Sequence, residues 1–512
     1  MKPYKIILFT FAVFSVLTVI CTLFPRDGLQ IGGLTLHFPS LSEVLQPTTA
    51  SESVAAETLM QQTMTSLEQM RQREQELQQN AERDRREAEF LRFFHENATR
   101  IYLPDDKNDY FDRFFAALDS AQKHPIRVLH YGDSQIEEDR ISGVLREAMQ
   151  TRFGGNGPGL LPIVQTVPST AIVQQCSNAM VPRYLVYGNT TSKISSRRYG
   201  VMGQMTQLDG ILTLSFSVRN WKETGRHCKH FSRLKLLLGN VERTVTTTLK
   251  TNGTTLPEQT IATNAGTHIL TFNLPQGSQQ VDLTLNGRAE LYGIMLDGNN
   301  GIAWDNIPMR GCSGTIFTGI NSAMPTHFCK SENVRLVVMQ FGGNIVPYVK
   351  NEQALTNYRT RMASQIQRIH TWAPNAKILF IGPADMSTSI DGQMQTYPFL
   401  PHIVEGLKTT ALENDAAFWD LYAAMGGKNS MIKWVRSNPP MAASDYIHFA
   451  HNGACKVADL LQQSLMIYYD YYKLRTDSVV HTLTPLALPK VQSVPLILPK
   501  QPIFVPNHTS KN

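Results

Sequence analysis

The sequence predicts an α/β protein in which a mainly parallel sheet, covered by helices on both faces, receives an inserted antiparallel β-sandwich. Three observations predict this class. Short apolar runs alternate with helical segments over residues 99–175 and again over residues 300–475. Residues 176–299 instead contain short segments rich in Thr, Val and Leu, separated by turns such as TNGTT and LPQGS. Residues 1–98 differ from both and predict a transmembrane helix followed by a helical stalk.

The composition is that of a globular protein. The chain has 512 residues, of which 42% are hydrophobic and 18% charged. This length allows more than one domain, since single cores rarely grow beyond ~250–300 residues. The net charge of +6 is a mild bias. Because the sequence contains no dense cluster of Lys and Arg, we do not expect nucleic acid as a partner.

Residues 1–25 predict a membrane anchor. The start MKPYK precedes the uncharged run IILFTFAVFSVLTVICTLF, which is long enough for one membrane crossing. Lys2 and Lys5 lie before the run, so we expect a cytoplasmic N-terminus and export of the remaining chain. The alternative is a cleaved signal peptide that releases a secreted protein. No A-x-A-like cleavage site follows the run, which favours the uncleaved anchor.

Residues 26–98 predict a linker and a helical stalk. The segment up to residue 56 is rich in Pro, Ser, Thr and Ala, and a long segment without Gly or Pro follows it. Apolar side chains recur there at heptad-like spacing, at Met60, Met64, Leu67, Met70 and Leu77. This narrow apolar seam indicates a helix or coiled coil. The seam is compatible with a homodimer formed through the stalk.

The α/β stretches supply the expected strands of the parallel sheet. RVLHYGD is the first buried strand, and the amphipathic segment ISGVLREAMQTRF follows it. Further apolar runs are RLVVMQF (335–341), KILFIGP (377–383) and AAFWDLY (416–422). Sheets of this kind place functional sites at the carboxyl ends of their strands. Residues 476–512 alternate Pro with apolar residues and predict an extended tail.

The cysteines allow a disulfide but no metal centre. An exported chain can form disulfides, and Cys312 with Cys329 is the pair that we expect, although spacing alone does not establish connectivity. The segment RHCKH (226–230) contains residues of metal-binding type without a companion pair elsewhere. We therefore expect neither a metal nor a cofactor.

The segment HYGDSQIEEDR contains the candidate nucleophile. Ser134 follows a Gly-Asp pair at the end of the first predicted strand and opens the next helix. The free N–H groups of that helix would face an oxyanion formed there. The alternative is a plain N-cap, since Ser and Asp are both favoured caps. We expect Glu137, Glu138 and Asp139 to complement the dipole of the first helical turn.

A serine nucleophile needs a base, and SDYIHFAHNG offers one in Asp445 and His448. Their spacing lets the carboxylate fix the imidazole tautomer while the other ring nitrogen faces the serine. A solvent-exposed pair is the alternative interpretation, and His451 reads as a helix cap. Asn344 and Gly311 follow predicted strands and are candidate donors to an oxyanion, although Asn and Gly are also common loop residues.

Ser134, Gly311, Asn344 and the Asp445/His448 pair occur in this order beside strand ends, and they resemble the four blocks of the SGNH (GDSL-like) hydrolase superfamily. HYGDSQIEEDRISGVLREAMQTRFGGNGPGLLP and LYGIMLDGNNGIAWDNIPMRGCSG are similar to segments of periplasmic peptidoglycan O-acetylesterases, which carry a carbohydrate-binding-like β-sandwich between these blocks. The resemblance covers about residues 125–475. Two features depart from that pattern: Gln135 stands where many of these esterases have His, and GGNI replaces GTND or GTNE.

The resemblance implies a three-layer α/β/α domain with a flavodoxin-like parallel sheet. It implies Ser134 as nucleophile, His448 as general base and Asp445 as its orienting partner. The implied oxyanion hole combines the N–H groups of Ser134 and Gly311 with the side chain of Asn344.

The implied function is that of a serine esterase that removes O-acetyl groups from a cell-envelope glycan, with peptidoglycan as the expected polymer. The expected location is a bacterial inner membrane, crossed once, with the bulk of the chain in the periplasm. Two alternatives remain: an O-acetyltransferase that acts on an envelope polysaccharide, and a non-catalytic scaffold or glycan-binding protein.

Overall fold

The computed structural model describes residues 3–25, 27–31, 34–46, 50–188 and 193–476. The chain divides into two units, Met1–Asp84 and Arg85–Asn512, and each is described by itself. The expected Pro-rich tail lies almost entirely outside the described residues.

The first unit begins with the apolar helix α1 (Pro3–Leu23). Its segment Tyr4–Leu23 has a mean hydropathy of 2.6 and is long and apolar enough to cross a membrane, a test that a signal sequence also passes. The expected linker contains a two-stranded hairpin, β1 (Leu29–Ile31) and β2 (Leu34–Leu36), and the short helix α2 (Leu41–Leu45). The helix α3 (Ala50–Glu96) follows, and its expected apolar seam is exposed, at Met60, Met64, Leu67, Met70 and Leu77.

The last turns of α3 belong to the second unit, so the expected stalk boundary at residue 98 is too late. Phe90, Phe93 and Phe94 are buried in the core of that unit. The ring of Phe94 stacks on that of Tyr468 with a centroid distance of 4.3 Å. This aromatic contact was not visible in the sequence pattern, which turns charged after Leu77.

A six-stranded sheet forms the centre of the α/β part. Its order is β14 (Ile302–Pro308), β4 (Ile126–Gly132), β15 (Val334–Gln340), β16 (Lys377–Ile381), β19 (Ala417–Trp419) and β3 (Ile101–Tyr102). The first five are parallel and β3 is antiparallel. Numbered along the chain, the parallel strands have the order 2-1-3-4-5, which is the flavodoxin-like arrangement.

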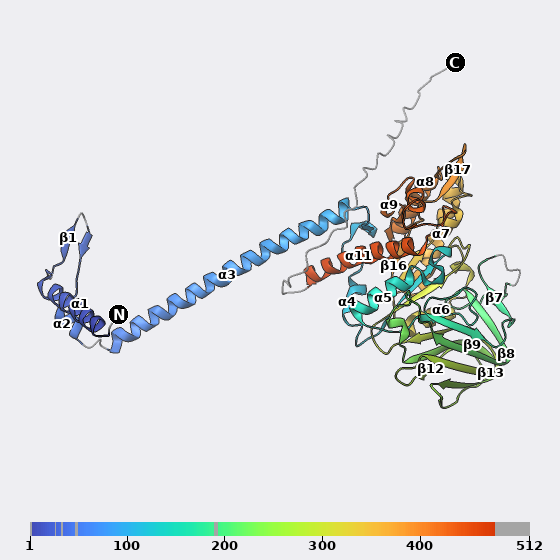
Figure 1. Cartoon of the computed structure of the whole chain (residues 1–512), viewed down its shortest axis with the longest axis horizontal. Helices are drawn as coiled ribbons and strands as arrows, with labels where there is room; N and C mark the ends of the chain where they lie inside the picture. The colour runs from blue at the N-terminus through green and yellow to red at the C-terminus, as the bar shows by residue number, and fades with distance from the viewer. Residues whose placement is uncertain (1–2, 26, 32–33, 47–49, 189–192, 477–512) are drawn as a thin grey trace, which may run out of the picture. The chain divides into compact units, whose positions relative to one another are not determined.

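Helices cover both faces of this sheet (Figure 1). Val128 of β4 packs in the cluster of one face and Leu129 in that of the other, as the two-residue period of a strand requires. The first face is covered by the end of α3 and by α4 (Asp112–Asp119), α5 (Ser142–Phe153), α9 (Leu421–Ala424), α10 (Ser430–Val435) and α11 (His451–Thr476). The second is covered by α6 (Ala323–Ser331), α7 (Glu352–Trp372) and α8 (Leu400–Glu413). A separate hairpin consists of β17 (Ser387–Ile390) and β18 (Gln393–Thr396).

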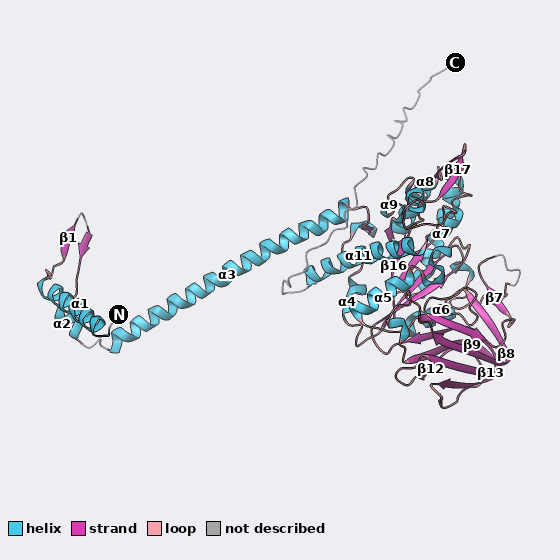
Figure 2. Ribbon diagram, in the orientation of Figure 1, coloured by secondary structure: helices cyan, strands magenta, loops and turns pink. Residues whose placement is uncertain are grey.

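The expected antiparallel region is present as one nine-stranded sheet (Figure 2). It starts at Gly159, earlier than the expected residue 176, because β5 pairs with β13. The long strand β13 lies between β8 and β9. The strands are β5 (Gly159–Leu161), β6 (Ile172–Cys176), β7 (Arg183–Leu185), β8 (Gln204–Val218), β9 (Arg233–Thr251), β10 (Thr254–Thr255), β11 (Gln259–Ile261), β12 (Asn264–Asn273) and β13 (Gln280–Asp297).

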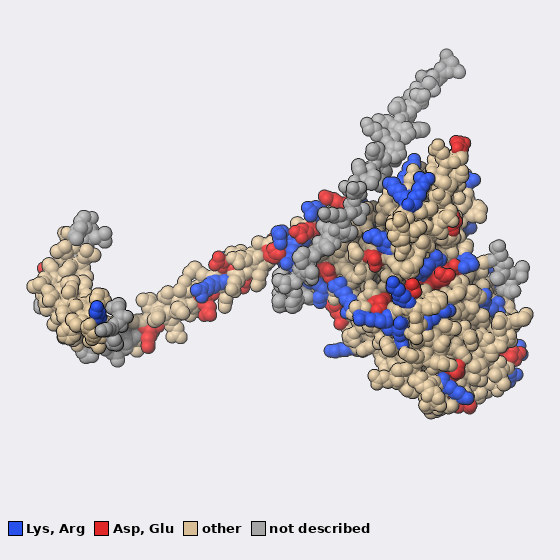
Figure 3. All heavy atoms as spheres, in the orientation of Figure 1, with Lys and Arg blue, Asp and Glu red and all other residues tan. Residues whose placement is uncertain are grey.

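Buried charges join the two sheets. Arg127 of β4 pairs with Asp297 of β13, with Asp305 of β14 and with Glu332, and Lys235 of β9 also pairs with Glu332. A paired network of this kind is costly to break, because removing one partner leaves a buried charge. On the outer face drawn in Figure 3, Lys and Arg side chains are interspersed with Asp and Glu side chains.

Candidate active site

Ser134 lies directly beyond the first parallel strand. β4 is buried along its whole length and ends at Gly132, where a Cβ atom would approach the side chain of Ile136 to 2.9 Å. The next residue, Asp133, caps the 3-10 helix η2 (Ser134–Asp139) by accepting the N–H of Gln135 at 3.0 Å. The capping role considered for Ser134 therefore falls to Asp133, and the Ser134 hydroxyl is free to make a different contact.

That contact is with His448. Ser134 Oγ lies 2.9 Å from His448 Nε2, and His448 Nδ1 lies 2.7 Å from Oδ2 of Asp445. Asp445 and His448 come from the loop between α10 and α11, where Tyr446 has a left-handed φ of 60°. The sequence-predicted nucleophile, base and orienting carboxylate thus form one hydrogen-bonded chain.

The hydrogen bonds of Asp445 determine the tautomer of His448. Its Oδ1 accepts the backbone N–H groups of Ile447 and His448. Burial acts to raise the pKa of Asp445, but hydrogen bonds from the imidazole and these N–H groups hold it below its ordinary value. An ionised carboxylate only accepts, so His448 Nδ1 is the donor and Nε2 is left to accept the serine proton.

Asn344 lies at the end of the neighbouring strand. β15 is followed by a left-handed Gly342, with a φ of 117°, and by the short 3-10 helix η5 (Gly343–Ile345). Asn344 Nδ2 donates to Oδ2 of Asp133 at 3.0 Å and to the carbonyl oxygen of Cys312 at 3.2 Å. These bonds connect the ends of β15, β4 and β14.

Asp133 is the buried acceptor for Asn344. Burial raises its pKa to about 6, although the N–H of Gln135, the His448 imidazole and the Asn344 amide act in the opposite direction. Above that pH the carboxylate accepts from Asn344 at full strength. The sequence indicated no role for Asp133 beyond capping, so its contact with Asn344 was not expected.

Gly311 lies in an exposed turn beyond β14. Its φ is 71°, and nothing lies within 4 Å of the position of a Cβ atom. The N–H of Met309 donates to the carbonyl of Gly132 at 2.8 Å, which fixes the end of β14 against the end of β4. Among the residues that the structure describes, the N–H groups of Gly311 and Ser134 have no hydrogen-bond acceptor. Both are therefore available to an oxygen atom of a ligand.

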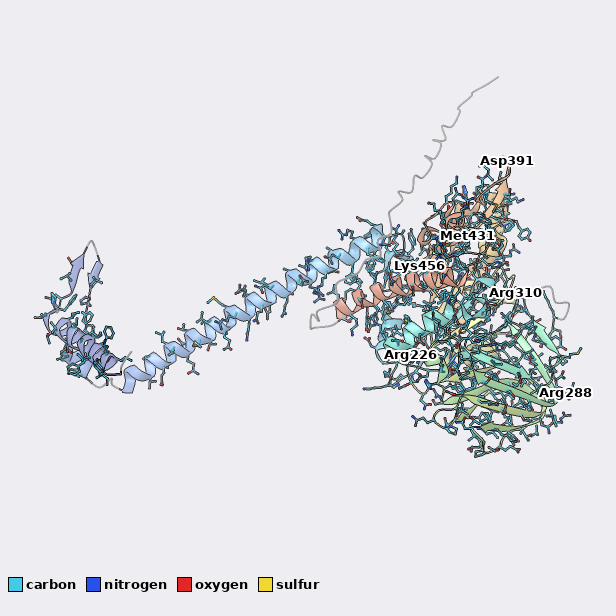
Figure 4. All side chains as sticks on the ribbon, viewed as in Figure 1. Arg226, Arg288, Arg310, Asp391, Met431 and Lys456 are labelled. Atoms are coloured by element: carbon cyan, nitrogen blue, oxygen red, sulfur yellow. The ribbon has the colours of Figure 1, made fainter. Side chains whose placement is uncertain are left out.

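Glu137 stands in the first turn of η2, as expected, and the acidic residues after Ser134 also pair with arginines, which the sequence pattern did not indicate. Glu137 is buried, and both of its oxygens accept from Arg310 at 2.7 Å. Asp139 is buried against Arg146. Figure 4 labels Arg310 between the strands of the antiparallel sheet and the α/β part. Because Arg310 directly precedes Gly311, Glu137 connects residues 134–140, called the serine segment below, to the turn that contains Gly311.

The cysteines correct another expectation. All six are free, so Cys312 and Cys329 do not form the expected disulfide. The Sγ of Cys312 instead accepts the N–H of Gly314 at 3.3 Å within its own turn. Cys228 of the RHCKH segment contacts Arg146, and the described residues contain no group of His, Cys, Asp and Glu suited to a metal ion.

Comparison with known proteins identifies the fold. No protein-family model matches the chain, and no curated protein matches it. Among solved structures, a peptidoglycan O-acetylesterase is similar over 73% of this chain and 100% of its own, with a TM-score of 0.58 and 18% identity. The chain has the SGNH-hydrolase fold.

Two further solved structures are more distant. A salicylyl-acyltransferase from a tetracycline biosynthetic pathway aligns over 60% of this chain and 97% of its own, with 11% identity and a TM-score of 0.27. A family two carbohydrate esterase from Cellvibrio japonicus aligns over 59% and 99%, with 11% identity and a TM-score of 0.21.

The SGNH-hydrolase fold places these residues at one edge of the sheet. The order of a flavodoxin-like sheet reverses between its first and third strands, and ligands bind at that switch point. Ser134 follows β4 and Asn344 follows β15, which are those two strands. The pairing of Glu137 with Arg310 was not predicted. The sequence signal for it is weak: an acidic run follows Ser134, and a lone Arg precedes Gly311.

Proposed function

We propose that the protein is a membrane-anchored, extracytoplasmic serine esterase that removes O-acetyl groups from a cell-envelope glycan, with peptidoglycan as the substrate. The observation that carries the proposal is the hydrogen-bonded chain from Ser134 through His448 to Asp445. The apolar segment Tyr4–Leu23 would be the anchor. The likeness to a peptidoglycan O-acetylesterase supports the choice of substrate.

The first half-reaction forms an acetyl-enzyme. Ser134 Oγ attacks the acetyl carbonyl carbon while its proton passes to His448 Nε2. The negative charge that develops on the carbonyl oxygen is stabilised by the N–H groups of Ser134 and Gly311. The ester C–O bond then breaks, and His448 returns the proton to the departing sugar oxygen.

The second half-reaction releases acetate. Water gives a proton to His448 and attacks the acetyl carbon, and Ser134 leaves with that proton. Asp445 stays ionised throughout and stabilises the imidazolium. Both hydrogens of Asn344 Nδ2 are engaged in the resting site, so its help to the oxyanion requires exchange of the Cys312 carbonyl for the substrate oxygen.

A cavity beside the serine segment supports a polymeric substrate. Its volume is about 350 Å³, and its walls come from η2, the end of β14, and the strands β5, β7 and β8. Polar side chains such as Gln165, Arg183 and Tyr187 alternate with Pro and Leu along it. Mixed walls of this kind suit sugars, which present hydroxyls at their edges and C–H groups on their faces. The sugars next to the acetylated one would lie here.

Release of acetate from O-acetylated peptidoglycan by the full-length protein in detergent tests the proposal. Ser134→Ala should lower kcat/KM by about 10³-fold or more, because only binding and oxyanion stabilisation remain. The matched control is Ser331→Ala, at an exposed serine at the end of α6, which should keep full activity. Acetate release that survives Ser134→Ala would refute the proposal. Acetyl transfer to an added sugar would instead identify an acetyltransferase.

A further inference from the structure

The loop that supplies the base is held by bonds within itself and by bonds to the segment that carries the nucleophile. Residues 443–450 carry Asp445 and His448, whose side chains are 46% and 36% exposed. Within the loop, the N–H of Ala443 donates to the carbonyl of His448 at 2.8 Å, and from outside it the N–H of Ser387 donates to the carbonyl of Tyr446 at 3.1 Å. Proton transfer needs the base to be held within fractions of an ångström. An exposed loop of this kind therefore needs a rigid support close to the imidazole.

The side chain of Gln135 hydrogen-bonds to the backbone on both sides of His448. Its Nε2 donates to the carbonyl of Ile447 at 2.7 Å, and its Oε1 accepts the N–H of Phe449 at 3.3 Å. An amide side chain offers a donor and an acceptor together and stays neutral at every pH of interest. Because Gln135 adjoins Ser134 in sequence, these two hydrogen bonds connect the loop of the base directly to the residue next to the nucleophile.

Arg140 makes a second connection between the same two segments. Its guanidinium donates to the carbonyls of Ser134 and Glu137 at 3.0 Å each and to the carbonyl of Phe449 at 3.1 Å. The side chain is 19% exposed. A planar guanidinium fixes the directions of its donors, so it holds these carbonyls in one geometry.

We propose that Gln135, assisted by Arg140, is a positioning residue that fixes His448 Nε2 at hydrogen-bond distance from Ser134 Oγ. This inference rests on the proposed function. Neither side chain bonds to the reacting hydroxyl or to the imidazole, so the pair governs the rate of proton transfer and leaves ester binding nearly unaffected. It also gives a role to the glutamine that replaces the histidine of many similar esterases.

The first test is Gln135→Leu in the full-length protein in detergent, with p-nitrophenyl acetate as substrate. Leucine has nearly the same size and can make neither hydrogen bond. We expect kcat to fall about tenfold while KM stays within about twofold, with active sites counted from the burst of p-nitrophenol. The matched control, Gln353→Leu on the exposed side of α7, should retain wild-type values. Wild-type kcat in Gln135→Leu would overturn the inference.

The second test is Gln135→Glu, with active sites again counted from the burst of p-nitrophenol at each pH. A protonated glutamic acid offers the same donor and acceptor as glutamine, whereas the ionised form only accepts and faces the Ile447 carbonyl. We expect the ratio of variant to wild-type kcat to fall as the pH rises from about 5 to about 8. The charged groups around position 135 are Asp133, Arg140 and the Asp445/His448 pair, and variant and wild type are compared at the same pH throughout. A ratio that stays constant with pH would overturn the inference.

Ser134→Ala separates this inference from the proposed function. If Ser134→Ala is inactive and the Gln135 variants are unimpaired, positioning by Gln135 is refuted while the esterase proposal stands. If Ser134→Ala keeps its activity, the esterase proposal fails and the inference fails with it.

Discussion

Asp133 is a buried carboxylate whose ionisation opposes folding, and replacing it with asparagine measures that cost. Burial raises its pKa from 3.8 to about 6. A difference of about two pKa units corresponds to ~3 kcal/mol, since each unit is worth about 1.4 kcal/mol. The pKa of Asp133 is higher in the folded than in the unfolded protein. Its contribution to the free energy of unfolding is therefore fully present below the unfolded pKa and is lost as the pH rises through about 6.

Asp133→Asn removes the charge and keeps one oxygen acceptor for the N–H of Gln135. Its new NH₂ group faces the Nδ2 of Asn344, so one hydrogen bond is lost at about 1 kcal/mol. We expect the free energy of unfolding to be about 1 kcal/mol below wild type at low pH and ~2 kcal/mol above it at about pH 7. Esterase activity should fall about tenfold, as expected for a lost hydrogen bond that orients Asn344.

Urea unfolding of the full-length protein in detergent, followed by tryptophan fluorescence from about pH 3.5 to about pH 7, measures the difference between variant and wild type. Asp391→Asn is the matched control, because Asp391 is exposed at the tip of the β17–β18 hairpin. Its difference from wild type should not vary with pH over this range. If the Asp133→Asn difference were equally flat, the reasoning from burial would be refuted.

Three further perturbations test other parts of the site. Asp445→Asn should lower kcat about 10²- to 10⁴-fold with little change in KM, because an amide favours the wrong imidazole tautomer; steady-state kinetics on p-nitrophenyl acetate that gave a wild-type kcat would contradict this. Arg310→Met leaves the buried carboxylate of Glu137 unpaired, so thermal unfolding should show a Tm lower by several degrees. Arg226→Met, at a pair whose carboxylate partner Glu147 is 28% exposed against 7% for Glu137, should leave Tm nearly unchanged, and equal effects of the two would count against the argument from the buried carboxylate. Tyr187→Ala should raise KM for acetylated peptidoglycan about three- to tenfold, through lost contacts of ~1 kcal/mol, and much more than for p-nitrophenyl acetate; equal effects on both substrates would argue against sugars in the cavity.

Much of the α/β part could be predicted, because buried parallel strands need apolar residues on both faces and so read as continuous runs. RVLHYGD, RLVVMQF and KILFIGP coincide with β4, β15 and β16. AAFWDLY contains only the short β19, since Asp420 already caps α9. The end of the stalk was misjudged because the aromatic residues of α3 find their partners on α11, far along the chain.

The site could be predicted in part for the same reason. The Asp445/His448 contact is local, so its spacing in the sequence carries a signal. The pairing of Glu137 with Arg310 joins residues 173 positions apart, and short acidic runs are common at helix starts, so the local pattern did not reveal this partner. The prediction of a Cys312–Cys329 disulfide was wrong for a related reason, because the spacing of two cysteines does not say which way their side chains point.

Ser134 and His448 lie 314 residues apart in the chain, with the whole nine-stranded sheet between them. A ribosome therefore completes the nucleophile long before the base, and the serine stays an ordinary hydroxyl until nearly all of the second unit has formed. A fragment that ends before residue 443 lacks both Asp445 and His448, so its serine has no base. The hydrogen-bonded chain of the site therefore exists only in a chain that has been completed beyond His448.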